Sequence, residues 1–256
     1  MQYKLTFFTI VFAGMLTQSY AQKNKQPQVQ QTSIWMEGFE ADGKLDEWQQ
    51  PLQAYTDDGH ISYSLANDDI NLYLVVTSNR ISKIFRGGVT FVAKRGDSVD
   101  LKITYPYNYT YDMIKYPNAA FMDPDRPKKL EDFVSIETSG LTENEAPLIG
   151  LVNQYGIQVG IGDKMEDSKV LADGEEYMIV EFAIPLSHLG GSIPSELEYG
   201  IHLRGIKAPS VPDLDRMPDS PNARSKKELN YIKMLARDAF IPLELKGTYR
   251  LATKPD

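Results

Sequence analysis

The stretch His60-Ile-Ser-Tyr-Ser-Leu-Ala-Asn67-Asp-Asp-Ile-Asn-Leu-Tyr-Leu-Val-Val76 indicates the fold more clearly than any other part of the chain. Its first half places Ile61, Tyr63 and Leu65 at alternate positions, which is the period of a strand with one buried face. Asn67-Asp68-Asp69 then favours a turn, because these side chains bond to their own backbone and tolerate left-handed angles. Apolar alternation resumes after the turn and continues to the end of the stretch. The stretch therefore predicts an antiparallel β-hairpin.

The same alternation recurs along most of the chain, with glycine and proline between the apolar runs. Asp100, Lys102 and Thr104 alternate with apolar residues, as expected where one face of an antiparallel sheet meets water. Further strands are expected at residues 89–93, 99–103, 132–138, 155–161, 177–184, 199–206 and 243–251. Short strands with turn signals at this density predict an all-β fold, an antiparallel two-sheet β-sandwich with immunoglobulin-like or jelly-roll-like packing.

Two segments interrupt the strand pattern. Residues 117–130 hold three prolines and many charges, and we expect them to leave the sheet. Residues 208–225 hold four prolines, which excludes a central strand or a helix interior. The helical spacing of apolar residues within 226–240 then predicts one C-terminal helix. We expect a single domain over residues 35–256, with a proline-rich excursion and helix at 207–240 and a closing strand at 243–251.

Residues 1–21 resemble a secretory signal peptide. Lys4 precedes an apolar run at residues 5–16, and Ser19-Tyr20-Ala21 places small residues where signal peptidase cleaves. The run is shorter than the roughly 20 residues that span a bilayer, so we expect no transmembrane anchor in the mature chain. Residues 22–34 are polar and rich in glutamine, which predicts a disordered linker. The protein is therefore expected to be exported, to the periplasm or the extracellular space.

Composition excludes several classes of function. The chain has 256 residues, no cysteine and a formal charge of −8, so thiolate metal sites, disulfides and nucleic-acid binding are not expected. His60, His188 and His202 lack the paired spacing of zinc sites. No nucleophile elbow, P-loop or dinucleotide fingerprint is present; Gly160-Ile-Gly162 lacks the rest of that fingerprint. We predict that the protein is not an enzyme, although sequence leaves open a glycosidase pair of carboxylates that meet only in space.

Residues Ala41-Asp-Gly-Lys-Leu-Asp-Glu-Trp48, followed by the hairpin described above, resemble the opening of family-9 carbohydrate-binding modules. These modules share their sandwich with DOMON-like sugar- and haem-binding domains. Residues 81–91 resemble the third-strand region of uncharacterised secreted relatives from Bacteroidetes-type bacteria. The resemblance covers roughly residues 36–206 and the last strand. It implies a β-sandwich that works beside secreted polysaccharide-degrading enzymes, without implying catalysis.

In family-9 modules two aromatic side chains enclose a terminal sugar, and this chain has only two tryptophans with which to match them. Trp48 belongs to the opening motif and is expected in the core.

Three hypotheses follow. The first is a non-catalytic domain that binds a polysaccharide or oligosaccharide, with a secreted carbohydrate-active enzyme or an envelope protein as further partner. The second is an envelope structural or interaction protein that has lost the sugar site. The third is a haem-binding domain, for which several methionines offer axial ligands.

The candidate sugar-binding residues are mainly tyrosines. Tyr105, Tyr107, Tyr109 and Tyr111 alternate, so an extended backbone would place their rings on one face about 7 Å apart. With Tyr116 they could stack on a glycan, or they could instead pack over a sheet edge. Trp35 is either a free aromatic or a plug on the sheet, and Arg86 is either a ligand clamp or part of a surface ion pair. The candidate residues are Tyr105, Tyr107, Tyr109, Tyr111, Tyr116, Trp35 and Arg86.

No resident cofactor is expected. Calcium is left open as an alternative, because acidic turns on β-sandwiches sometimes bind it. Such turns occur at Asp57-Asp58, Asp68-Asp69, Asp123-Pro-Asp125 and Asp213-Leu-Asp215. Each of them is equally explained by carboxylates that bond to their own backbone.

Overall fold

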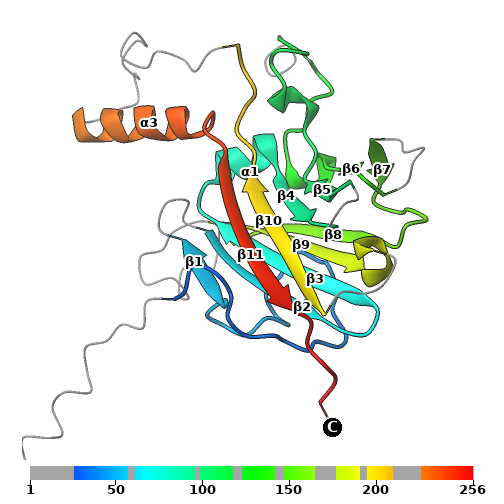
Figure 1. The fold of residues 1–256 in the computed structure, drawn as a ribbon. Helices are drawn as coiled ribbons and strands as arrows, with labels where there is room; N and C mark the ends of the chain where they lie inside the picture. The colour runs from blue at the N-terminus through cyan, green and yellow to red at the C-terminus, as the bar shows by residue number, and fades with distance from the viewer. Residues whose placement is uncertain are drawn as a thin grey trace, which may run out of the picture.

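The computed structural model describes residues 26–56, 61–95, 99–117, 123–141, 147–164, 177–190, 195–209 and 226–255. The predicted signal peptide lies outside these residues, as do the first residues of the linker and most of the proline-rich excursion. Two antiparallel sheets lie face to face, with β10 and β11 crossing in front of the other sheet in Figure 1. The predicted all-β two-sheet sandwich is confirmed.

The five-stranded sheet has the order β1-β2-β3-β9-β8. These strands are β1 (Ala54–Thr56), β2 (Ile61–Asn67), β3 (Asn71–Ser78), β9 (Tyr177–Pro185) and β8 (Gln158–Lys164). The predicted hairpin forms β2 and β3, with Leu65 opposite Leu74. The Oδ1 atom of Asp68 accepts hydrogen bonds from the backbone N–H groups of Ile70 and Asn71, at 2.7 and 2.6 Å, which closes the turn as expected.

The six-stranded sheet has the order β11-β10-β4-β5-β6-β7. Its strands are β11 (Leu243–Arg250), β10 (Glu196–Leu203), β4 (Val89–Ala93), β5 (Leu101–Tyr105), β6 (Ser135–Ser139) and β7 (Leu148–Gly150). Every pair of neighbouring strands is antiparallel. The short strands β1 and β7 are too brief to show alternation, and sequence patterning did not predict them. The main core lies between the two sheets, where Tyr63, Phe91 and Phe182 are fully buried.

Helix α3 (Lys226–Asp238) confirms the predicted C-terminal helix and extends away from the end of the sandwich (Figure 1). A second helix, α1 (Ile81–Gly87), occupies the segment that resembled a third-strand region, and the strand begins only at Val89. The strand expected at residues 89–93 is confirmed as β4, and the residues before it form a helix because Ile81, Ile84 and Phe85 have helical spacing and pack together against the core. The described residues also form three short 3-10 helices, η1 (Tyr109–Tyr111), η2 (Leu130–Asp132) and η3 (Leu186–Leu189).

The described part of the predicted linker, residues 26–34, contacts the sandwich. Gln30 is buried, and its side-chain amide accepts from Leu65 N at 2.6 Å and donates to Leu65 O at 2.8 Å. The backbone oxygen of Pro27 accepts from Tyr55 N at 2.9 Å. The Gln30 side chain satisfies the backbone of β2 beyond the end of β1, so this part of the segment is not the unattached linker that its composition predicted.

Candidate functional site

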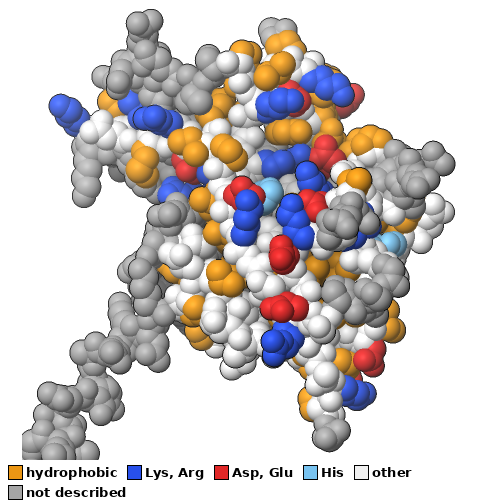
Figure 2. All heavy atoms as spheres, in the orientation of Figure 1, with side chains coloured by type: hydrophobic (Ala, Val, Ile, Leu, Met, Phe, Trp, Pro, Cys, Tyr) orange, Lys and Arg blue, Asp and Glu red, His pale blue; other side chains and the backbone are white. Residues whose placement is uncertain are grey.

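The outer faces of the two sheets differ in what covers them. Outside the five-stranded sheet, Met36, Trp48 and Tyr73 belong to a second apolar cluster, and Trp48 is buried as predicted. The outer face of the six-stranded sheet carries acidic and basic side chains interspersed over β10 and β11 (Figure 2). A polar ligand can therefore reach the outer face of the six-stranded sheet.

A row of polar side chains crosses this outer face at one level of the strands. The strand registers place Glu244 opposite His202, His202 opposite Thr90, Thr90 opposite Thr104 and Thr104 opposite Glu137. The hydroxyl oxygens of Thr90 and Thr104 lie 2.7 Å apart. Five strands thus contribute hydrogen-bonding groups to a single line across the sheet.

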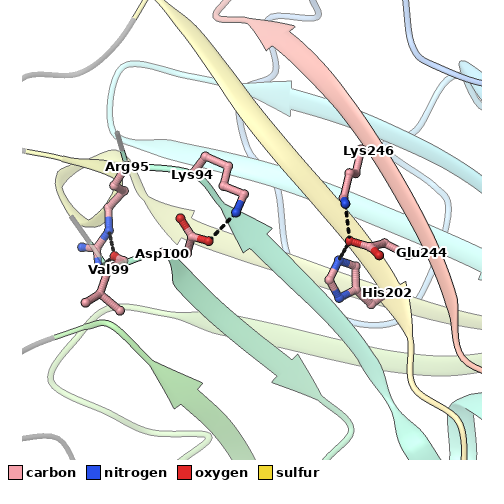
Figure 3. A network of polar contacts seen from close by, with 7 residues as sticks. All are labelled: Lys94, Arg95, Val99, Asp100, His202, Glu244 and Lys246. Carbon is pink, nitrogen blue, oxygen red and sulfur yellow. Dashed lines mark hydrogen bonds and ion pairs between the residues drawn. The ribbon is translucent and has the colours of Figure 1, made fainter. Parts of the chain in front are cut away.

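Glu244 is the centre of an ionic cluster on this face (Figure 3). Its Oε1 atom lies 3.1 Å from His202 Nε2 and 2.9 Å from Lys246 Nζ. Burial lowers the pKa of His202, and the neighbouring Glu244 carboxylate partly opposes this shift. The hydrogen bond from Lys246 lowers the pKa of Glu244. A second pair on the same face joins Lys94 Nζ to Asp100 Oδ2 at 2.6 Å.

A hollow of about 490 Å³ opens at the end of this row, where β10 and β11 meet the segments that follow β10 and α3. Its walls combine the rings of Tyr111, Phe240 and Pro242 with the polar side chains of His202 and Arg204. The lining residues are Tyr111, His202, Arg204, Gly205, Ile206, Lys207, Ala208, Phe240, Pro242, Leu243 and Glu244. Together these residues define the hollow.

Arg204 is the most constrained polar side chain of the hollow. Its Nε donates to the backbone oxygen of Gly87 at 2.6 Å, and its Nη1 forms an ion pair with Glu137 Oε2. The guanidinium carbon lies 4.1 Å from the centroid of the Tyr111 ring, a cation–π contact. The Nη2 atom is buried, and no described residue accepts a hydrogen bond from it. A buried donor without an acceptor is costly. The Arg204 side chain as a whole is 19% exposed, so a ligand in the hollow could contact its exposed part.

The predicted row of four tyrosine rings on one extended face does not form. Tyr105 ends β5 with its ring in the core, where burial raises its pKa to about 12. Two residues after Pro106, Asn108 turns the chain: its Oδ1 accepts from Thr110 N at 3.1 Å and from the Thr110 hydroxyl at 2.7 Å. This side-chain cap starts the 3-10 helix η1, and helical geometry abolishes the alternation.

The other predicted tyrosines surround the same end of the sheet. Tyr111 lines the hollow. Tyr107 is half-buried, and burial raises its pKa, with Glu137 and the other nearby tyrosines contributing. Tyr109 and Tyr116 form an edge-to-face pair with centroids 5.7 Å apart, and the Tyr109 hydroxyl donates to Asp123 Oδ2 at 2.6 Å. Tyr109 thus anchors the excursion after residue 117, while Tyr107 and Tyr111 lie closest to Arg204 and Glu137.

Trp35 is not brought together with the tyrosines, whereas α1, which carries Arg86, lies beside their segment: Phe85 O accepts from Asn108 Nδ2 at 3.1 Å. Trp35 is half-buried, bridges the backbone of Asn67 at the end of β2, and donates from Nε1 to Glu37 Oε1 at 3.1 Å. Asn67 contacts Tyr249, near the opposite end of β11 from the hollow. Arg86 lies in the last turn of α1, and its side chain makes no hydrogen bond or ion pair with another described residue.

Sequence reasoning missed His202, Arg204 and Glu244 as a group. A signal was present, because His202 and Arg204 occupy alternate positions on the water-facing side of a predicted strand. Nothing local pairs that strand with β11, whose Glu244 is more than forty residues away in the chain. Their meeting is therefore visible only in the sheet.

Among the described residues, no three His, Asp or Glu side chains gather closely enough to hold a metal ion. Two of the acidic turns listed above are described: Asp68 closes the hairpin turn, and Asp123 Oδ1 accepts from Asp125 N at 2.9 Å. The turns at Asp57-Asp58 and Asp213-Leu-Asp215 lie outside the described residues. None of the helices in the described ranges is long and apolar enough to cross a membrane.

No protein-family model matches this chain, and no curated protein matches it. Among solved structures, it is similar to a family-9 carbohydrate-binding module from Caldicellulosiruptor kristjanssonii in complex with glucose. The similarity covers 88% of this chain and 97% of the module's chain, with 11% sequence identity and a TM-score of 0.36. This is a distant similarity, and the sandwich described above rests on the strands and sheets themselves.

Proposed function

We propose that this protein is an exported, non-catalytic carbohydrate-binding domain and that the hollow is its binding site. The observation that carries the proposal is the partly exposed side chain of Arg204 in the wall of the hollow, with its guanidinium carbon 4.1 Å from the centroid of the Tyr111 ring. A sugar presents hydroxyl oxygens next to an apolar C–H face. The guanidinium donor matches the former and the aromatic ring matches the latter.

The walls of the hollow support the same assignment. Tyr111, Phe240 and Pro242 supply apolar surface, whereas His202 and Glu244 supply hydrogen-bonding groups at one end. Ligand sites generally combine mostly apolar walls with a few polar groups that fix orientation. Tyr107 and Tyr116, half-buried near the same end of the sheet, are proposed to extend the aromatic contact beyond the hollow.

The carboxylates of this region support binding without catalysis. Glu137 is paired with Arg204, and Glu244 is held by Lys246 and His202. A glycosidase general acid needs a carboxyl group whose pKa is raised, whereas the hydrogen bond from Lys246 lowers the pKa of Glu244. Glu244 therefore does not have the environment of a general acid.

The proposal includes export, which the signal-like residues 1–21 support. It also includes a polysaccharide or oligosaccharide as the ligand. A secreted carbohydrate-active enzyme or an envelope protein is the proposed further partner. These follow from the sequence and are tested separately from the hollow, by cell fractionation and by co-purification.

The test of the binding site uses a panel of sugars with matched variants. Insoluble cellulose, chitin and xylan are used in pull-down assays, and glucose, galactose, xylose and N-acetylglucosamine are titrated by calorimetry. We expect retention of at least one probe by the wild-type chain and its loss in Tyr111→Ala, whereas Tyr155→Ala, a change in a tyrosine outside the hollow, retains binding. Absence of binding to every probe at millimolar concentration would contradict the proposal and favour an envelope interaction protein instead.

A further inference from the structure

We infer that Lys83 of helix α1 positions the Phe240–Pro242 wall of the hollow through its ion pair with Asp238. The effect of this ion pair on sugar affinity rests on the proposed function, whereas the positioning of the wall by Lys83 does not. Lys83 is only 4% exposed, and its Nζ lies 3.1 Å from Asp238 Oδ1. A buried ammonium group is costly without a partner, and Asp238 is the carboxylate that Lys83 contacts among the described residues.

Arg80, at the start of α1, reinforces the same contact. Its Nε lies 3.7 Å from Asp238 Oδ2, so both oxygens of this carboxylate face cations of one short helix. Asp238 is itself three-quarters buried. Partly buried ion pairs of this kind hold a segment more firmly than exposed pairs, because solvent screens them less.

Asp238 is the last residue of α3, and the wall follows it directly. Ile241 N donates to Asp238 O at 3.1 Å, and Ile206 N donates to Ala239 O at 2.7 Å. A Cβ atom on Gly205 would lie 2.6 Å from Phe240 O, which shows how closely the two backbones approach. Anchoring Asp238 therefore fixes the backbone that carries Phe240 and Pro242.

The other end of α1 holds the opposite wall. Gly87 O accepts from Arg204 Nε at 2.6 Å, and Gly88 O accepts from Arg204 N at 3.2 Å. A Cβ on Gly87 would lie 1.9 Å from Arg204 O, so α1 and the segment after β10 are in direct backbone contact. The seven-residue helix α1 thus sets the distance between Arg204 on one side of the hollow and the Phe240–Pro242 wall on the other.

The experiment measures amide hydrogen exchange in the full chain without ligand, comparing wild type with Lys83→Met, Asp238→Asn and the double variant. Methionine keeps the length of the lysine stem, and asparagine keeps the shape of the aspartate. We expect exchange at Ile206, at residues 239–241 and at Leu243 to accelerate by roughly fivefold or more in each single variant, without change in β2, β3 or β9. Both changes remove the Lys83–Asp238 pair, and Asp238→Asn also removes the Arg80 contact, so the double variant should add little to Asp238→Asn alone.

Two outcomes overturn the inference: unchanged local exchange in either folded single variant, or additive effects in the double variant. Asp238→Asn alters a partly exposed side chain and therefore keeps the test available if Lys83→Met does not fold. In the folded variants, the four monosaccharides of the panel are then titrated, and affinity for any that wild type binds should fall roughly threefold to tenfold, because the wall is less preorganised. If wild type binds no sugar, the proposed function fails while the exchange result still decides the role of Lys83.

Discussion

The indole Nε1 of Trp48 donates a 2.8 Å hydrogen bond to Oε1 of Glu181, a carboxylate with no exposed surface. Glu181 lies on β9 and points to the outer side of the five-stranded sheet, between Val75 and Gly160 on the neighbouring strands. Its Oε2 accepts from Gly43 N at 2.8 Å. The opening motif at residues 41–48 is thus fastened to the sheet through a single buried side chain.

We expect Glu181 to make stability depend on pH. Burial raises its pKa to about 7 in the folded chain, against 4.5 as its ordinary value, although the bonds from Trp48 and Gly43 oppose the shift. Because the folded pKa is raised, the stability that protonated Glu181 contributes is fully present below about pH 4.5 and is lost as pH rises through 7. The free energy of unfolding should fall by roughly 3 kcal/mol over this range. Urea unfolding at pH 4.5, 6 and 7.5 measures it.

Glu181→Gln should flatten this dependence, since glutamine does not titrate. It should also lower stability at pH 4.5 by about 1–3 kcal/mol, because the amide NH₂ cannot accept one of the two hydrogen bonds. Glu198→Gln, a change in an exposed residue of β10, is the matched control. An unchanged pH slope in Glu181→Gln would show that another group titrates in this range.

Gly162→Ala should destabilise the protein by about 1–3 kcal/mol, because the added methyl group has no space. A Cβ at this position would lie 2.1 Å from Gly43 O, where the opening motif lies directly on β8. Gly150→Ala is the control, because its Cβ would meet nothing nearer than 3.5 Å. Thermal unfolding of both variants makes the comparison, and equal melting temperatures would contradict the close packing of residues 41–43.

Arg204→Met should weaken sugar binding by roughly tenfold or more, because it removes the donor fork beside Tyr111. Arg204→Lys should weaken sugar binding by as much as Arg204→Met, since an ammonium group keeps the charge but not the planar set of donors. Pull-down and calorimetry with the panel of sugars measure both variants, and Lys102→Met, an exposed change on the same sheet face, should bind like wild type. Full binding by Arg204→Lys would mean that charge alone is recognised.

His202 should titrate below its ordinary pKa of 6.5, because burial disfavours the imidazolium. A lowered pKa means that the stability it contributes is present above pH 6.5 and is lost as pH falls through the folded value. Titration of the imidazole protons by NMR gives the midpoint directly. Glu244→Gln should lower the midpoint further, because the carboxylate favours the charged ring. An unchanged midpoint would show that the 3.1 Å contact is absent in solution.

The hairpin at residues 61–78 could be predicted because alternation and an Asx turn are local properties, decided by neighbouring residues alone. The tyrosine segment shows the limit of the same rule. Alternation from Tyr105 to Tyr111 predicted one extended face, but the side chain of Asn108 bonds to Thr110 and starts a 3-10 helix. A period of two cannot distinguish a strand from a capped turn when one residue supplies the cap.

The structural role of Gly160-Ile-Gly162 could not be predicted from the sequence. As a motif it is an incomplete fingerprint, whereas in the structure both glycines make room for the backbone of residues 41–43. The partner segment lies more than a hundred residues earlier in the chain. No local pattern records such a contact.

From the sequence alone follow the β-sandwich class, the principal hairpin, the buried Trp48 and the C-terminal helix, because each depends on the periodicity or chemistry of a short run of residues. Only the tertiary structure decides which outer sheet face stays open and which residues form the hollow there. Tyr111, Arg204 and Glu244 come from three separate stretches of chain, and they meet because strand pairing and α1 bring those stretches together. Proximity of that kind is a property of the packed sheets and leaves no trace in local spacing.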